Sequence, residues 1–105
     1  MSATVKEELE KFNRERDWDQ FHSPENLAKS IAIEAGELLE CFQWSNDFDQ
    51  ESVIDELADI YNYCVQLADK LDVCLDAIAL EKIEKTRLKY PIDKAKGKST
   101  KYNKL

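Results

Sequence analysis

The sequence contains very little glycine, proline or histidine. There are two glycines, two prolines and one histidine in 105 residues. Tight turns between strands depend on glycine and proline, so their scarcity argues against an all-β fold. The single histidine, His22, excludes any motif that needs two. No apolar run approaches the roughly 20 residues that span a bilayer, so we expect no membrane partner.

Cysteine is also sparse, and its spacing is uninformative. Cys41, Cys64 and Cys74 are odd in number and lack C-x-x-C spacing. The segment MSATVKEELEKF has no apolar stretch of the kind that a secretory signal requires. We therefore expect reduced thiols in a cytoplasmic protein.

Basic residues are scarce in most of the chain and abundant at its C-terminal end. Residues 1–81 carry 20 acidic and 6 basic side chains, whereas residues 82–105 carry 2 acidic and 9 basic ones, for a net charge of −7. An acidic body argues against a nucleic-acid partner, because proteins that bind nucleic acids are usually basic. The distribution suits a protein that holds metal cations in one place and phosphates in another. A soluble acidic bundle with a basic tail would show the same distribution.

Regularly spaced apolar residues predict helices. The expected ranges are about 3–15, 24–42, 50–71 and 73–89. Ser23 is the expected N-cap of the second helix and Pro24 its first residue, and Asp72 is expected to cap the fourth. Residues 90–105 form a basic tail without helical periodicity. We therefore expect an all-α four-helix bundle in a single domain over residues 1–105.

The second and third predicted helices are joined by a short polar connection and should form an antiparallel hairpin. Apolar residues lie around more than one stripe of each helix, which is more than a single-chain bundle needs. We expect the additional surface to be buried by oligomerisation.

Carboxylates interrupt the most apolar parts of both helices. Glu34, Glu37 and Glu40 lie in IAIEAGELLECF, and Glu56 and Asp59 lie in VIDELADIYNYC. Residues three apart share a helix face, so each helix projects a pair of acids that the hairpin can set opposite the other pair.

Few cations lie nearby in the sequence to balance these charges. Lys29 is the only lysine or arginine between residues 17 and 69. Converging carboxylates repel one another without a cation, and oxygen-only ligands favour Mg²⁺ or Mn²⁺. Gly36, between two of the acids, costs a helix about 1 kcal/mol relative to alanine, which is consistent with close approach by another helix or a ligand. The alternative is a solvated acidic stripe.

The basic end offers partners for phosphate. Lys82, Lys85 and Lys89 share one face of the fourth predicted helix, and Lys96 and Lys101 follow in the tail. Because Mg²⁺ usually binds together with substrate phosphates, the acids and lysines together indicate a nucleotide or another polyphosphate. A lysine-rich end that merely balances charge remains the alternative.

Aromatic residues suggest where a nucleobase would bind. Trp18, Trp44 and Tyr63 can stack on bases. His22 and Asn26 flank the start of the second helix and can contact a base or sugar edge. Each of these residues could equally have a structural role.

These residues together resemble the MazG-like all-α NTP pyrophosphohydrolases, in particular the dCTP pyrophosphatase-like branch. The family pattern E-x-x-E…E-x-x-D is matched by Glu34-Ala-Gly-Glu37 and Glu56-Leu-Ala-Asp59, with 18 residues between them. RERDWDQFHSPENLAKSIAIEAGELLECFQW resembles the N-terminal block of that branch. KYP at residues 89–91, with KG and KY further on, resembles its C-terminal block.

The resemblance implies Mg²⁺-dependent hydrolysis of (d)NTPs, with dCTP or a related deoxynucleotide as substrate, to the monophosphate and pyrophosphate. It implies a bundle assembled from dimers, often paired into tetramers, in which one active site uses two chains. The implied metal ligands are Glu34, Glu37, Glu56 and Asp59. The implied base-binding residues are Trp18, Trp44 and Tyr63. The implied phosphate contacts are Lys82, Arg87, Lys96 and Lys101. We expect Lys85, on the same helix face as Lys82, and Tyr102 to contact phosphate as well.

For the reaction, we expect Glu37 or Glu40 to orient or deprotonate the attacking water. The expected role is housecleaning of the nucleotide pool. The alternative is a non-catalytic helical interaction or nucleotide-sensing module.

Overall fold

The computed structural model describes residues 4–105, and every regular element among them is helical. The elements are α1 (Val5–Glu15), η1 (Asp19–Phe21), α2 (Pro24–Glu40), α3 (Gln50–Lys70), α4 (Leu75–Lys89), α5 (Ile92–Ala95) and η2 (Tyr102–Lys104). This confirms the all-α class. The predicted start of the first helix, Ala3, lies outside the described residues. Within residues 4–105, no helix combines the length and apolar character needed to cross a membrane.

The N-terminus of α2 is capped as the sequence predicts. The Ser23 hydroxyl accepts a hydrogen bond from the backbone N–H of Asn26 at 3.1 Å, and Pro24 is the first helical residue. Asp49 caps α3 in the same way, with its side chain accepting from the N–H of Ser52 at 3.3 Å. These caps satisfy backbone donors that no helical carbonyl can reach.

The prediction that Asp72 caps the fourth helix is wrong. The helix starts at Leu75, and the residue before it, Cys74, makes no side-chain capping bond. Asp72 instead ends α3 in the left-handed conformation, with φ of 56°, which a short polar side chain tolerates. The N–H of Val73 then donates to the Ala68 carbonyl at 3.0 Å, a Schellman-type termination.

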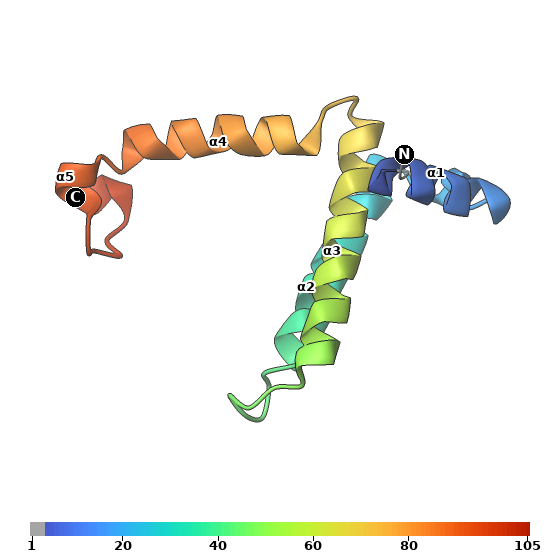
Figure 1. Ribbon diagram of the computed structural model, residues 1–105, viewed down its shortest axis with the longest axis horizontal. Coiled ribbons are helices and arrows are strands. Elements are labelled where there is room, and N and C mark those ends of the chain that lie inside the picture. The colour runs from blue at the N-terminus through green and yellow to red at the C-terminus, as the bar shows by residue number, and fades with distance from the viewer. Residues whose placement is uncertain (1–3) are drawn as a thin grey trace. The chain divides into compact units, whose positions relative to one another are not determined.

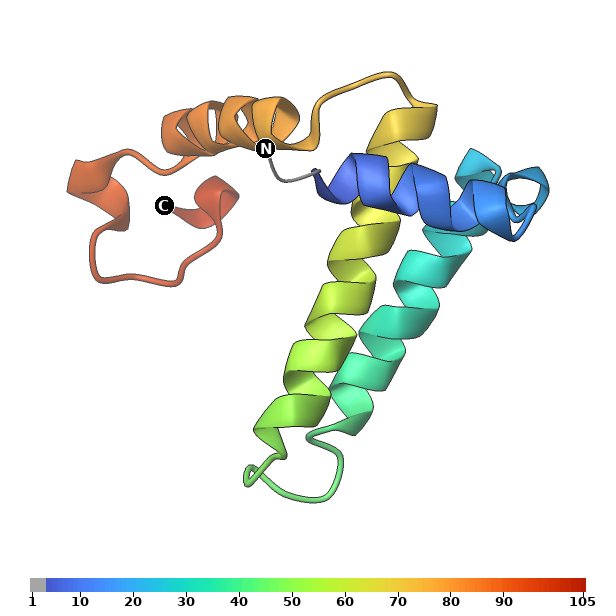
Figure 2. The same ribbon diagram turned by 45° about the vertical axis from the view of Figure 1, so that its right-hand side comes forward.

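The chain divides into two compact units, and the boundary between them falls between Val73 and Cys74. In the first unit, α2 and α3 form the predicted antiparallel hairpin, and α1 lies across α3 (Figures 1 and 2). The connection between α2 and α3, residues 41–49, lies at the end of the hairpin away from α1 (Figure 2).

The core of the first unit is small. Leu27 is fully buried and Ala68 is 6% exposed, and they are the buried apolar residues within the described chain. Other large apolar side chains of the hairpin remain open to solvent, including Ile33 at 62%, Leu39 at 72% and Leu57 at 58% exposure. The first unit by itself therefore leaves much of the hairpin's apolar surface uncovered, in line with the second apolar stripe seen in the sequence.

The second unit contains α4 and the tail. The tail is more ordered than its lack of helical periodicity indicates. α5 and η2 each form a short turn of helix within the segment expected to be irregular. Tyr102 packs edge-on against Tyr90, with ring centroids 6.2 Å apart, and its N–H donates to the Tyr90 hydroxyl at 3.2 Å. The Lys89 ammonium lies 4.7 Å from the centre of the Tyr102 ring. Aromatic and cation–π contacts thus organise a segment too short to show periodicity.

Candidate functional site

The hairpin brings three of the predicted metal ligands together. One carboxylate oxygen from each of Glu34, Glu56 and Asp59 lies within 4.8 Å of the others, and we call these residues the acid cluster. Glu34 and Glu56 are half-buried, and each has a buried Oε2 atom without a hydrogen-bond partner. Buried oxygens without a donor are costly, and a divalent cation would satisfy them. The donor set therefore fits a hard metal ion.

The electrostatics of the acid cluster point the same way. The neighbouring Glu56 carboxyl, together with burial and the charge of Glu37, raises the pKa of Glu34 to about 7. The contact with Glu34 lowers the pKa of Glu56. Burial and the charges of Glu37 and Asp59 outweigh that contact, so this pKa is also raised. Negative charge is therefore crowded at the cluster, which favours a cation.

Glu37 and Glu40 lie outside the acid cluster. They line a separate acidic hollow of about 450 Å³ between the end of α2 and the start of α3, together with Asp49 and Ser52. Glu56 also lines this hollow, so it is common to the hollow and the cluster. Glu37 remains close enough for its charge to raise the pKa of both Glu34 and Glu56.

A larger hollow of about 660 Å³ lies between α1 and α3, and we call it the α1–α3 hollow. It contains three of the predicted base-binding residues: Trp18, His22 and Tyr63. Asp59 lines it as well and so joins it to the acid cluster. Aromatic side chains and a carboxylate cluster thus meet along one edge of α3.

The turn after α1 positions Trp18. Asp17 adopts a φ of 54°, and the N–H of Trp18 donates to the Asn13 carbonyl at 2.9 Å. The indole then packs edge-on against Phe12, with ring centroids 5.5 Å apart. The Arg16 guanidinium covers the Phe12 ring at 3.8 Å. Local backbone geometry and these ring contacts together hold the indole beside the hollow.

Two other predicted base-binding residues do not line the α1–α3 hollow. Trp44 is 89% exposed and belongs to the connection at the far end of the hairpin (Figure 2). Asn26 donates its side-chain N–H to the Phe21 carbonyl at 2.9 Å and so ties η1 to the start of α2. Within one chain, Trp44 is therefore remote from the hollow, and Asn26 has a structural contact.

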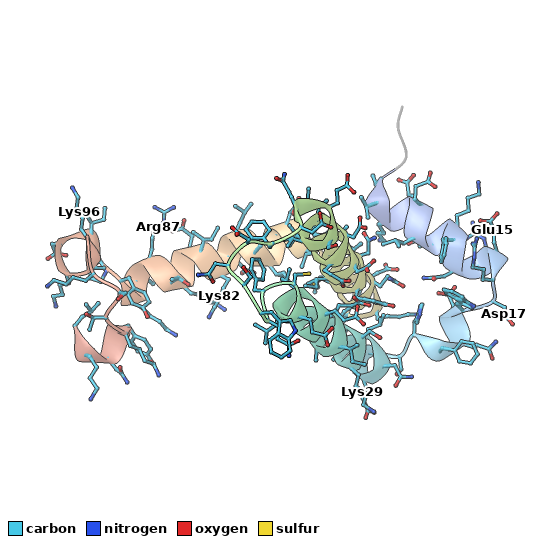
Figure 3. The ribbon with its side chains drawn as sticks, turned by 90° about the horizontal axis from the view of Figure 1, so that it is seen from below. Glu15, Asp17, Lys29, Lys82, Arg87 and Lys96 are labelled. Carbon is cyan, nitrogen blue, oxygen red and sulfur yellow. The ribbon has the colours of Figure 1, made fainter. Side chains whose placement is uncertain are left out.

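The predicted phosphate-binding residues belong to the second unit. Lys82, Arg87 and Lys96 extend from its ribbon in Figure 3. Arg87 pairs with Glu84, with Nε 3.2 Å from the carboxylate. The remaining members of the predicted set, Lys85, Lys101 and Tyr102, are exposed as well.

An amide pair in the α1–α3 hollow was not found from the sequence. Asn13 is only 5% exposed, and its Nδ2 donates to Oε1 of Gln66 at 2.7 Å. Both residues line the hollow. Asn13 follows Leu9 by four residues, on the inward stripe of α1, and a polar residue on that stripe is the signal that could have revealed it.

Comparison with known proteins gives matches to a family, to individual sequences and to a solved structure. Residues 29–105 match the MazG-like family. The chain is 38% identical to human dCTP pyrophosphatase 1 and 36% identical to the rat protein of that name, in matches that cover 90% of this chain. The chain spans 61% of the length of these relatives.

A solved structure agrees in both fold and sequence. A pyrophosphatase from Archaeoglobus fulgidus superposes with a TM-score of 0.73 at 36% identity, covering 87% of this chain and 96% of that one. The chain belongs to the MazG-like family. The resemblance seen in the sequence is thereby confirmed.

Proposed function

We propose that the protein is a Mg²⁺-dependent nucleoside triphosphate pyrophosphohydrolase. It hydrolyses dCTP or a related deoxynucleotide to the monophosphate and pyrophosphate. Membership of the MazG-like family supports this, as do the names of the relatives, dCTP pyrophosphatase 1 and pyrophosphatase.

The main observation behind the proposal is that Asp59 lies in two sites at once. Asp59 belongs to the acid cluster and also lines the α1–α3 hollow. A base stacked on Trp18 or Tyr63 in the hollow would place its phosphates toward the carboxylates. A nucleotide has this same division into an aromatic base and an anionic chain that travels with a divalent cation.

Glu34, Glu56 and Asp59 would hold the Mg²⁺ ion, or Mn²⁺ in its place, with Glu37 as a fourth ligand. An ion held there would supply positive charge to neutralise the phosphate oxygens of the substrate. Glu37 or Glu40 orients the attacking water and accepts its proton. The acidic hollow that these two residues share with Glu56 supports this assignment.

The basic residues of the second unit bind the phosphates and stabilise the departing pyrophosphate. This set comprises Lys82, Lys85, Arg87, Lys96, Lys101 and Tyr102. Trp44, 89% exposed in one chain, completes the base site of another copy in a homodimer or homotetramer. The exposed apolar residues of α2 and α3 support such an assembly.

The proposed role is housecleaning of the cytoplasmic nucleotide pool, with no nucleic-acid or membrane partner. The acidic body of the chain supports the assignment of no nucleic-acid partner.

Incubation of the purified protein with Mg²⁺ and a panel of (d)NTPs, followed by chromatography of the products, tests the proposal. We expect monophosphate and pyrophosphate, with most of the turnover lost in Glu56→Gln. Glu51→Gln, an exposed acid in the first turn of the same helix, is the matched control. Diphosphate and orthophosphate would show that a different bond is cleaved. Nucleotide binding without any turnover would favour a nucleotide-sensing module.

A further inference from the structure

The amide pair, Asn13 and Gln66, joins α1 to α3 where an apolar contact would suffice for packing. The two residues are 53 apart in the sequence, and the bond between them is 2.7 Å long. Asn13 is only 5% exposed. Burying an amide costs folding free energy unless its polar atoms are hydrogen-bonded. The pair lies in the wall of the α1–α3 hollow, so a ligand in the hollow can use the remaining polar capacity.

The hydrogen bonds fix how the two amides are oriented. The Nε2 group of Gln66 donates to the Asn62 carbonyl at 3.2 Å, which leaves Oε1 as the acceptor for Asn13. Asn13 therefore uses its NH₂ group toward Gln66. Its carbonyl oxygen, Oδ1, is left as an acceptor without a protein donor among the described residues.

A third polar group lies in the same wall. The Nδ1 atom of His22 is buried and has no hydrogen-bond partner among the described residues. Asn13, Gln66 and His22 also line a smaller cavity of about 20 Å³, which is large enough for one water. The stacking faces of Trp18 and Tyr63 accept any base, so polar groups such as these are needed to distinguish one base from another.

We propose, on the basis of the proposed function, that Asn13 is a specificity-determining residue held in place by Gln66. Its Oδ1 accepts a hydrogen bond from the exocyclic amine of cytosine. Uracil carries a carbonyl oxygen at that position, so two acceptors would face each other and both would remain unpaired. Sites built to pair with a polar group reject analogues that lack it far more strongly than apolar pockets do.

The test compares binding of dCMP and dUMP, which differ at this position, by titration calorimetry. The variant combines Asn13→Leu with Gln66→Met, which keeps the side-chain shapes and leaves neither partner orphaned. Asn46→Leu, at an exposed site in the α2–α3 connection, is the matched control.

We expect the wild type and Asn46→Leu to favour dCMP by about tenfold or more, and the paired variant to bind both nucleotides within about twofold. An unchanged ratio in a folded paired variant, or no preference in the wild type, would overturn the inference.

A second measurement does not depend on folding of the variant. The wild type is titrated with the deoxynucleotide of 2-pyrimidinone, which is cytosine without its amine. We expect it to bind about tenfold more weakly than dCMP, and equal affinity would overturn the inference. Hydrolysis of triphosphates is measured separately. Turnover without base preference defeats this inference alone, whereas base preference without turnover defeats the proposed function alone.

Discussion

The acid cluster predicts that the stability change on removing one carboxylate depends on whether metal is present. Glu56→Gln removes one of three carboxylate charges whose oxygens lie within 4.8 Å of one another. Two charges at that separation repel by about 0.9 kcal/mol at the permittivity of water and by about 3.5 kcal/mol at an effective permittivity of about 20. Removing Glu56 relieves its repulsion by the neighbouring carboxylates, so the variant should be more stable than the wild type when metal is absent.

Mg²⁺ should stabilise the wild type more than it stabilises Glu56→Gln. One kcal/mol corresponds to about 4–8 °C in Tm for a domain near this size, and Glu56→Gln should melt measurably above the wild type in EDTA. A ligand at a hundredfold excess over its Kd stabilises the folded protein by about 2.7 kcal/mol. The wild type should gain this increment, whereas the variant has lost a ligand and should gain less.

Calorimetric unfolding at pH 8, in EDTA and along a Mg²⁺ titration, measures both effects. Glu51→Gln removes an exposed acid from the first turn of α3 and should lower Tm slightly under both conditions, because it weakens a favourable helix-dipole interaction. A Tm for Glu56→Gln in EDTA equal to or below that of the wild type would refute the repulsion argument. An undiminished Mg²⁺ response would remove Glu56 from the ligand set.

The remaining predictions concern the base site, the open face of α2 and the core. Trp18→Ala should raise KM by about tenfold through lost stacking, and Trp44→Ala should loosen base preference if another copy supplies that ring. Steady-state kinetics over a (d)NTP panel measures both effects. An unchanged substrate profile in either variant would remove that residue from the site. Gly36→Ala should stabilise an isolated chain by about 1 kcal/mol, because nothing lies within 4 Å of the added methyl group. Loss of the oligomer in light scattering would instead show that a second chain packs against Gly36. Leu27→Ala should cost about 3–5 kcal/mol in urea unfolding because Leu27 is fully buried, and a cost under about 1 kcal/mol would contradict the observed core.

The hairpin could be predicted from the sequence because its signals are local. Ser23 and Pro24 mark the start of α2, and the long apolar stripe of α3 ends within a residue of its predicted limit. The start of α4 was misjudged because Asp72 is equally suited to capping a helix and to a left-handed turn, and the backbone after α3 selects the turn. The short helix α5 has too few residues to show a period.

The candidate site was predictable only in part. Spacing places Glu56 and Asp59 on one helix face, but the register between α2 and α3 decides which acid of α2 lies close to both, and this is Glu34. Glu37 instead lies with Glu56 in the acidic hollow. The bond from Asn13 to Gln66 depends on how α1 crosses α3. No pattern within either helix specifies that crossing, so the α1–α3 hollow emerges only from the tertiary structure.

The small core has a consequence for how much protein a cell must make. Leu27 and Ala68 are the buried apolar residues within the described chain, so one chain alone gains little from folding. If copies associate as proposed, folding and assembly become a single equilibrium that depends on concentration. Halving the number of chains would then lower activity by more than half. The level of expression would set the folded fraction as well as the number of molecules.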